Sequence, residues 1–286
     1  MKTYGSIEAG GTKFVLAVGD ENNKILKSTQ IKTTLPDETI KKTLSFFKEN
    51  PVDALGIGSF GPIDITPDSP TYGYITSTPK KGWTNYNLLA EIQKALNIPI
   101  NFTTDVNASA YGEMILTGEK SLVYLTIGTG IGGGAVQNGQ FIGGFSHAEM
   151  GHQWVKRHPD DLDFKGICPY HNDCLEGVAA GPSIEARTGI RGEDLPDDHP
   201  VWEIQAYYIA QIAMNTTLSF APDQIIFGGG VMGKPGMLKK VQQNFITLLN
   251  GYVRIPKTVE NYLVLPHIQN NASATIGNFE LAKRMK

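Results

Sequence analysis

Residues 4–18 read YGSIEAGGTKFVLAV, which sets a glycine pair between two short apolar runs. The β-prone residues of Tyr4–Glu8 and Phe14–Val18 predict two strands, and Gly10-Gly11-Thr12 predicts the turn between them. A second turn rich in Asp and Asn follows, and Ile25–Ile31 then reads as a third strand. The chain therefore opens with three consecutive short strands joined by tight turns.

The same order returns in the second half of the chain. Leu122–Ile127 and Ile131–Val136 predict two strands around Gly128-Thr129-Gly130, and Asn138-Gly139 predicts a hairpin turn before Gln140–Ile142. Two similar halves favour two lobes, and a cleft between lobes is a common place for a ligand.

Apolar periodicity over the rest of the chain predicts an α/β protein. Strands are expected at 54–57, 100–104, 224–227 and 262–265, and helices from Pro36 and over 87–96, 106–116, 204–218, 238–249 and 272–282. We expect an N-terminal lobe over residues 1–115, with the C-terminal helix of 272–286 packing back on it, and a C-terminal lobe over 116–271. Residues 144–180 have no counterpart in the first half and read as an insertion in the second lobe.

Composition and charge exclude several classes of protein. A chain of 286 residues is long enough for two domains, and its formal net charge is -3 with no run of Lys or Arg longer than two. Such a surface offers no footprint for a phosphate backbone, so no nucleic-acid partner is expected. No apolar run approaches the roughly 18 residues of a membrane span, and the N-terminus lacks a signal-peptide core. We therefore expect a cytoplasmic protein that does not contact a membrane.

Three glycine-rich loops are candidate cradles for nucleotide phosphates, because glycine lets backbone N–H groups approach an anion closely. They lie within residues 8–13, 126–134 and 225–231, each at the end of a predicted strand. Any one of them could be a plain turn, but three at equivalent places in a duplicated fold favour a nucleotide site. The candidate residues are Glu8, Gly10, Gly11, Thr12, Lys13, Thr129, Gly130, Gly228, Gly229 and Gly230.

Two carboxylates at strand ends have separate candidate roles. Asp105 follows the strand at 100–104, where it could orient a hydroxyl and accept its proton during phosphoryl transfer, or simply cap the next helix. Glu8 ends the first strand and suits a metal ion or its waters. The place of Asp105 at a strand end near the expected cleft makes it our candidate general base.

Both cysteines of the chain fall in one short Cys-x2-His-x2-Cys motif. Together with a histidine upstream, the motif has the donor set of a closed, tetrahedral structural zinc site. The expected ligands are His152, Cys168, His171 and Cys174. His147 and His158 are alternatives for the fourth ligand. Two free thiols or a Cys168–Cys174 disulfide are alternatives to metal, although a cytosolic setting argues against the disulfide.

Two glutamates, Glu149 and Glu176, flank this cluster in sequence. Long acidic side chains held beside a rigid site are suitable acceptors for sugar hydroxyls. From their own positions alone they could equally be solvated surface charges.

These motifs together resemble the ROK (repressor, open reading frame, kinase) family of bacterial sugar kinases over essentially the whole chain. The three glycine loops match the family's two phosphate motifs and its adenosine motif, and residues 105–110 and 272–277 match its two inter-lobe connections. Glu149-Met150-Gly151-His152 resembles the Glu-x-Gly-His signature, and Cys174-Leu175-Glu176-Gly177 resembles the Cys-Leu-Glu element.

The resemblance implies an α/β fold of two ribonuclease-H-like lobes, of the actin-like ATPase kind, around a central cleft, with a zinc-binding insertion in the second lobe. It implies ATP with Mg²⁺ as the phosphoryl donor and Asp105 as the catalytic base. Sugar contacts are implied for Asp105, Glu149, His152 and Glu176, with His152 also a ligand of a structural Zn²⁺. A homodimer is a further expectation from the family.

Two departures from the usual pattern are similar to the fructokinase branch. Glu8 stands where the family usually has Asp, and Cys-Pro-x-His-x-x-Cys replaces a three-cysteine element. Thr104 also occupies a position where many glucokinase-like members carry a sugar-binding Asn. The implied reaction is phosphorylation of a hexose by ATP, with D-fructose giving fructose 6-phosphate. Mannose, glucose or an N-acetylhexosamine are alternative acceptors.

Two other classes of protein share features of this pattern. Sugar-sensing regulators of the family carry an N-terminal helix-turn-helix domain, which is disfavoured because the first phosphate strand begins by Tyr4. ATPases and chaperone-like members of the actin-like fold are disfavoured by the Glu-x-Gly-His signature and the zinc element.

Overall fold

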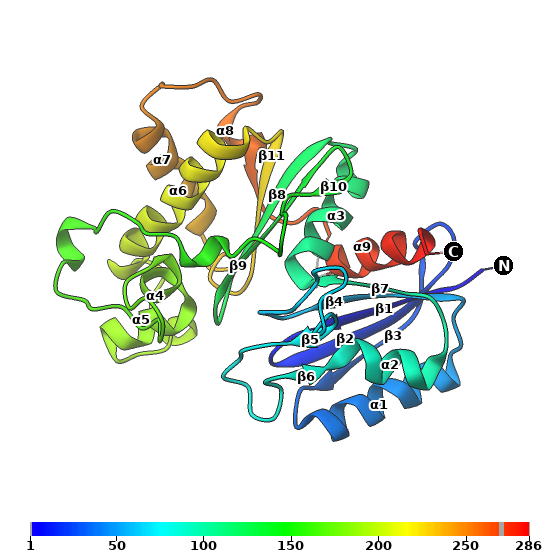
Figure 1. Cartoon of the computed structure of the whole chain (residues 1–286). Coiled ribbons are helices and arrows are strands. Elements are labelled where there is room, and N and C mark those ends of the chain that lie inside the picture. Colours follow the sequence, from blue (N-terminus) through cyan, green and yellow to red (C-terminus); the bar gives the residue numbers. More distant parts are fainter. Residues whose placement is uncertain (1, 269–271, 286) are drawn as a thin grey trace. The chain divides into compact units, whose positions relative to one another are not determined.

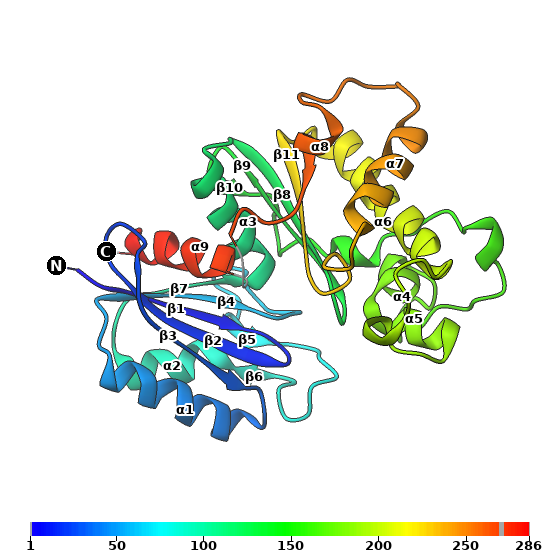
Figure 2. The same cartoon turned by 180° about the vertical axis from the view of Figure 1, so that it is seen from behind.

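The computed structural model describes residues 2–268 and 272–285, which form two compact units (Figures 1 and 2). Unit 1 consists of Met1–Gly118, Phe141–His147 and His267–Lys286, and unit 2 consists of Glu119–Gln140 and Ala148–Pro266. Sequence patterns put the first lobe boundary after residue 115 and residues 141–147 in the second lobe. In the folded chain the division follows Gly118, and Phe141–His147 groups with unit 1.

Unit 1 is built on a mixed five-stranded sheet in the order β3-β2-β1-β4-β7. The strands are β1 (Tyr4–Ala9), β2 (Lys13–Gly19), β3 (Ile25–Lys32), β4 (Ala54–Ser59) and β7 (Ile100–Thr104). The first three are antiparallel neighbours, and β4 pairs in parallel with both β1 and β7. The two parallel pairings bring the carboxyl ends of β1, β4 and β7 to one edge, where the candidate residues of this unit lie.

Helices cover both faces of this sheet, as Figure 1 shows. The helices are α1 (Pro36–Glu49), α2 (Leu88–Leu96), α3 (Asp105–Thr117) and α9 (Ala272–Lys283), and a short hairpin joins β5 (Tyr74–Ile75) to β6 (Tyr86–Asn87). On the side of α1 and α2, apolar residues of the sheet such as Ile7, Leu16 and Leu55 are fully buried. The helix over 36–49 buries Ile40 and Phe47, as its predicted apolar face requires.

Two glycines allow α3 and α9 to touch backbone to backbone. A Cβ on Gly112 would lie 1.8 Å from the carbonyl oxygen of Ser273, and a Cβ on Gly277 would lie 1.9 Å from that of Ala108. Neither distance is possible for a side chain, so only glycine fits at these crossing points. The crossing fixes α3, and therefore the position of Asp105 at its first turn.

Unit 2 repeats the strand arrangement, in the order β10-β9-β8-β11-β12. The strands are β8 (Ser121–Ile127), β9 (Ile131–Gln137), β10 (Gln140–Phe141), β11 (Gln224–Gly228) and β12 (Leu263–Val264). β8 is antiparallel to β9 and parallel to β11, as β1 is to β2 and β4. The two similar halves expected from the sequence are thus confirmed at the level of strand order.

Unit 2 has five helices among its described residues, and the sequence patterns did not predict three of them. The five are α4 (Leu175–Ala179), α5 (Gly181–Thr188), α6 (Val201–Phe220), α7 (Met237–Leu249) and α8 (Val259–Tyr262), with single 3-10 turns at Met150–His152, Pro159–Asp161 and Gly192–Asp194. The three that were not predicted are α4, α5 and α8. The strand expected over 262–265 is wrong in its first residue and its last, because Tyr262 ends α8 and the strand is only Leu263–Val264. Among the residues that the structure describes, no helix combines the length and apolar character that crossing a bilayer requires.

Candidate functional site

The first glycine loop is the tight turn between β1 and β2. The N–H of Gly10 donates to the carbonyl of Lys13 at 3.0 Å, and a Cβ on Gly10 would lie only 2.7 Å from that oxygen. At Gly11, by contrast, an added Cβ would meet no atom within 4 Å. The loop therefore presents one open backbone edge, which is the property that an anion-binding loop needs.

Asp105 lies at the start of α3 but is not its cap. The N-cap is Thr104, whose Oγ1 accepts a hydrogen bond from the N–H of Asn107 at 3.1 Å. The capping interpretation of Asp105 is therefore wrong, because its neighbour already supplies that interaction. Asp105 is half-buried, and its Oδ1 accepts a hydrogen bond from the N–H of Val106 at 2.9 Å.

Glu8 and Asp105 are brought to the same edge of unit 1 through Gly58. In the parallel pairing of β1 and β4, Glu8 is the register partner of Gly58. A Cβ on Gly58 would lie 3.2 Å from the Cα of Asp105, so β4 and the first turn of α3 pack without a side chain between them. The structure thus groups the candidate base with the candidate acceptor for a metal ion or its waters.

The second and third glycine loops meet within unit 2. The N–H of Gly181 donates to the carbonyl of Gly128 at 2.7 Å, and the N–H of Val231 donates to the carbonyl of Ile127 at 3.0 Å. Gly229 has a φ of +89°, and a Cβ there would lie 2.3 Å from the Ile127 oxygen. Glycine is required at this position for both reasons.

These two loops form one wall of a cavity of about 800 Å³. That volume lies in the range of roughly 300–1,000 Å³ that is usual for small-molecule sites. The candidates Thr129 and Gly230 line it, with Gly128 and Val231. The cavity beside these two loops is therefore large enough for a small-molecule ligand.

Several residues of this cavity were missed from the sequence. They are Gly181, Pro182, Ile184, Glu185, Arg191, Gly192, Glu193, Asp197, Trp202, Gly233, Lys234 and Pro235. Lys234 holds part of the wall together, since its Nζ lies 2.8 Å from Asp197 Oδ1 and 4.7 Å from the centre of the Trp202 ring. The Gly181-Pro182 pair, a typical helix start, was the one local signal for this wall.

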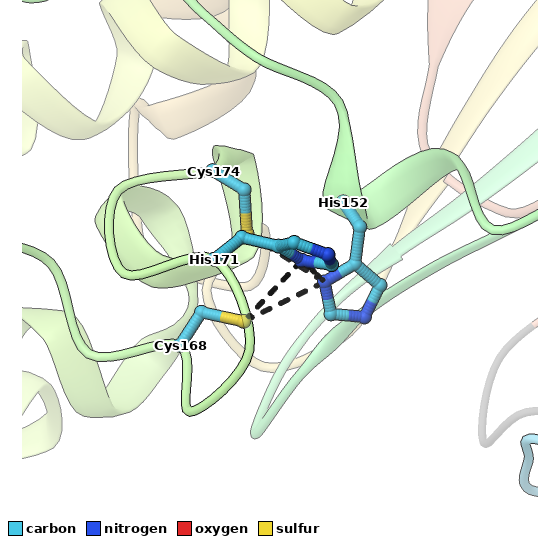
Figure 3. A group of neighbouring side chains, drawn as sticks. All are labelled: His152, Cys168, His171 and Cys174. Carbon is cyan, nitrogen blue, oxygen red and sulfur yellow. Dashed lines mark hydrogen bonds between the residues drawn. The ribbon is translucent and has the colours of Figure 1, made fainter.

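The four predicted metal ligands converge in unit 2, as Figure 3 shows. Nδ1 of His152 lies 3.6 Å from Sγ of Cys168, 3.6 Å from Sγ of Cys174 and 3.3 Å from Nδ1 of His171. Bond lengths of about 2.3 Å to sulfur and about 2.0–2.1 Å to nitrogen give edges of about 3.3–3.8 Å in a tetrahedral zinc site. The donor set and its spacing therefore fit Zn²⁺.

The alternative fourth ligands make other hydrogen bonds, and the two cysteines do not form a disulfide. His158 instead accepts a hydrogen bond from the N–H of Asp160 at 3.1 Å, and His147 pairs with Ser146. Cys168 and Cys174 are not joined in a disulfide, so the disulfide interpretation is wrong for this structure. Burial above all, and then the neighbouring Cys168, raises the pKa of the Cys174 thiol to about 11. A bound cation would reverse that effect and favour the thiolate.

The two flanking glutamates differ in setting. Glu149 is exposed, and its carbonyl accepts a hydrogen bond from the N–H of His152 at 3.2 Å. Glu176 is half-buried, and its Oε1 lies 3.9 Å from Nε2 of His152. Its Oε2 accepts a hydrogen bond from the N–H of Ile131 at 2.9 Å. Glu176 thus lies between the His/Cys cluster and the residue that follows the Gly128-Thr129-Gly130 turn.

Comparison with known proteins gives concordant matches over nearly the whole chain. The sequence profile of the ROK family matches residues 4–285. A fructokinase from Lactococcus lactis subsp. cremoris is 64% identical over 98% of this chain and 96% of its own length. A fructokinase from Streptococcus mutans serotype c is 57% identical over 99% and 98%, respectively.

Solved structures match the fold at low identity. A ROK hexokinase from Thermus thermophilus superposes with a TM-score of 0.80 at 22% identity, covering 98% of each chain. A ROK family glucokinase from Streptomyces griseus, in complex with glucose and AMPPNP, gives a TM-score of 0.75 at 21% identity and covers 99% of each chain. The two units of this chain, each a mixed five-stranded sheet with helices, therefore have the fold of the ROK sugar kinases.

Proposed function

Because the chain belongs to the ROK family, we propose that it transfers the γ-phosphoryl group of ATP to the 6-hydroxyl of D-fructose. The observation that carries this proposal is the near-full-length identity to proteins named fructokinase, 64% in the first of the two. The described residues add the parts that such a reaction needs: a candidate base, glycine loops and a cavity of suitable size.

Each of the three glycine loops is proposed to bind part of the nucleotide. The cavity lined by Thr129, Gly230 and Trp202 in unit 2 would take the base and ribose. Backbone N–H groups at Gly11 and Gly130 would face the phosphates, where charge spreads over the phosphoryl oxygens as transfer proceeds. Mg²⁺ bound with ATP would neutralise part of that charge, and Glu8 is the proposed acceptor for the ion or its waters.

Asp105 is the proposed general base. It would accept the proton of the 6-hydroxyl as that oxygen bonds to the γ-phosphorus and the bond from phosphorus to the β–γ bridging oxygen breaks. ADP is the leaving group, so the step needs no oxidant and no further reactant. The half-buried side chain at the start of α3 supports this role, since α3 is held in place by its close crossing with α9.

The cluster of His152, Cys168, His171 and Cys174 is proposed to hold one structural Zn²⁺. The support for this assignment is the donor set and the convergence of the four ligand atoms, which all lie within 4.8 Å of one another. Zinc would fix the segment 144–180, and with it the sugar-contact candidates Glu149, His152 and Glu176. The expected fold has two ribonuclease-H-like lobes, with this segment as an insertion in the second.

Product analysis tests the proposed reaction directly. With MgATP and fructose, the purified protein is expected to form ADP and fructose 6-phosphate in equal amounts, which phosphorus NMR of the product identifies. ADP formation that is independent of any sugar would identify an ATPase instead. Phosphate on another hydroxyl would overturn the assignment of the 6-hydroxyl.

A further inference from the structure

The turn between β3 and α1 is bonded to the first glycine loop through one buried threonine. Thr33 is 3% exposed, and its Oγ1 donates to the carbonyl of Gly10 at 2.7 Å. Its backbone N–H donates to the carbonyl of Thr12 at 2.9 Å. Thr33 therefore holds both carbonyls that flank Gly11, although it lies outside every motif identified in the sequence.

The turn that carries Thr33 is itself fixed on its far side. The indole Nε1 of Trp83 donates to the carbonyl of Thr34 at 2.8 Å, and Trp83 is fully buried against the ring of Phe14. The N–H of Thr34 donates to Oγ1 of Thr39 at 3.0 Å in the first turn of α1. The residue next to Thr33 is thus tied to the core and to a helix, so the Thr33 hydroxyl is held at a defined place.

The Gly10 C=O and the Gly11 N–H belong to the same peptide unit, so the direction of one fixes the direction of the other. A trans peptide unit directs its N–H away from its own C=O. Because the C=O of Gly10 is directed at the Thr33 hydroxyl, the N–H of Gly11 is directed away from Thr33. An added Cβ on Gly11 would meet nothing within 4 Å, so the backbone there is open to a ligand.

We infer that Thr33 is a positioning residue for nucleotide phosphate, because its hydroxyl fixes the orientation of the Gly11 N–H. The inference rests on the proposed function, which places the phosphates of ATP on this loop. Glycine pairs are the most flexible backbone, and a donor stabilises developing charge best when its orientation is set before the reaction. Valine has the shape of threonine without the hydroxyl, so it would remove the bond to the Gly10 carbonyl while keeping the backbone bond to the Thr12 carbonyl.

The test compares Thr33→Val with a matched control and a rescue variant. Thr43→Val removes another buried threonine hydroxyl of unit 1, which donates to the Thr39 carbonyl within α1 at 2.9 Å and not to a carbonyl of the glycine loop. Thr33→Ser keeps the hydroxyl. One neutral hydrogen bond corresponds to about 1 kcal/mol, or roughly a fivefold effect.

Thr33→Val is expected to weaken ADP binding, measured by calorimetry, roughly fivefold, and to lower kcat/KM for MgATP at least as much, while KM for fructose stays unchanged. Thr33→Ser and Thr43→Val are expected to match the wild type in both measurements. Equal ADP affinity in Thr33→Val and Thr43→Val would overturn the inference. So would a parallel loss for fructose, which would indicate a general structural defect.

Two further outcomes are also decisive. If Thr33→Val does not fold, Thr33→Ser decides, because loss of ADP affinity in a folded protein that retains the hydroxyl contradicts the inference. If the wild type binds ADP but phosphorylates no sugar, the proposed function fails. The comparison of ADP affinities then still tests the role of Thr33 independently.

Discussion

Glu176 accepts a hydrogen bond at 2.9 Å from the backbone N–H of Ile131, the residue that follows the second glycine loop. The other carboxylate oxygen of Glu176 faces His152 in the metal cluster at 3.9 Å. One side chain therefore contacts both the proposed phosphate loop and the proposed zinc site. A substitution in the glycine loop or in the cluster should therefore displace the Glu176 carboxylate.

Gly130→Ala tests this contact. A Cβ there would lie 2.7 Å from Oε2 of Glu176, so the carboxylate must move and its bond to Ile131 lengthens or breaks. We expect kcat/KM to fall roughly tenfold for both MgATP and sugar, as for loss of a hydrogen bond to a charged group worth about 1.5 kcal/mol. Gly144→Ala is the control, because a Cβ at Gly144 meets nothing within 4 Å. Equal kinetics for the two variants would contradict the role of Glu176.

The site residues that could be predicted belong to short, continuous sequence motifs. The residues that could not be predicted lie far apart in the sequence and meet only in the folded chain. The glycine loops and the Cys-x2-His-x2-Cys motif are continuous in sequence, and the cluster forms as expected once His152 is added. The sequence alone did not show that Thr104, and not Asp105, caps α3. Trp202 and Lys234 were missed, because they meet only where α6 and the segment after β11 come together. The hydrophobic pattern of the sequence does not predict such a tertiary contact.

In the fold, too, the elements with a clear pattern along the sequence were predicted and several without one were not. Strongly periodic helices and strands bounded by turn residues were predicted within a few residues, including the opening three-strand unit and its repeat. Several short elements were missed, among them α5 with eight residues and β5 and β6 with two each. Elements of that length are too short for a period to be visible, and tertiary packing determines them.

Asp105→Asn tests the general base. The amide keeps the size of the side chain but cannot accept the hydroxyl proton, so kcat is expected to fall by roughly 10²–10⁴. ADP affinity should stay near the wild-type value, because the residue is proposed to act on the sugar hydroxyl. Single-turnover and steady-state rates provide the measurement, with calorimetry for ADP. A variant with near-normal kcat would refute the assignment.

Zinc content tests the metal cluster. Elemental analysis of protein purified without added metal is expected to find zinc, at about one ion per chain, since closed four-ligand sites bind tightly. Cys174→Ser should lose the metal and lower Tm, whereas Asp160→Asn, on an exposed side chain near the cluster in sequence, should do neither. A metal-free wild type with full activity and unchanged Tm would exclude a structural role for zinc.

The buried pair of Arg187 and Asp161 provides a test of stability. Burial raises the pKa of Asp161, but the hydrogen bonds from Arg187 and Tyr208 and the nearby guanidinium charges outweigh it, so the pKa lies below its usual value. Arg187→Met would leave Asp161 without its bidentate partner at 2.8 Å. Arg157 and Tyr208 still face the carboxylate, so we expect a loss of about 1.5–3 kcal/mol in the free energy of unfolding at pH 7.

The pH dependence of that loss follows from the sign of the shift. A group with a lowered pKa contributes stability above its unfolded pKa, about 3.9 for Asp, and this contribution disappears as the pH falls through the folded pKa. The gap between wild type and Arg187→Met should therefore persist at pH 5 and narrow below about pH 4. Exposed Arg191→Met is the control, with an expected effect below about 1 kcal/mol. Urea unfolding at each pH measures both, and equal effects of the two variants would contradict the account.

The most direct test of the central claim is kcat/KM with MgATP for fructose, mannose, glucose and N-acetylglucosamine. Hexoses share most hydroxyls, and each unmade buried hydrogen bond costs about 1–3 kcal/mol, or roughly 5- to 150-fold in kcat/KM. We expect fructose to have the highest value, mannose to come second and glucose to be clearly lower. A glucose value above that of fructose would contradict the assignment of the acceptor, and failure of all four sugars would contradict the assignment of the protein as a sugar kinase.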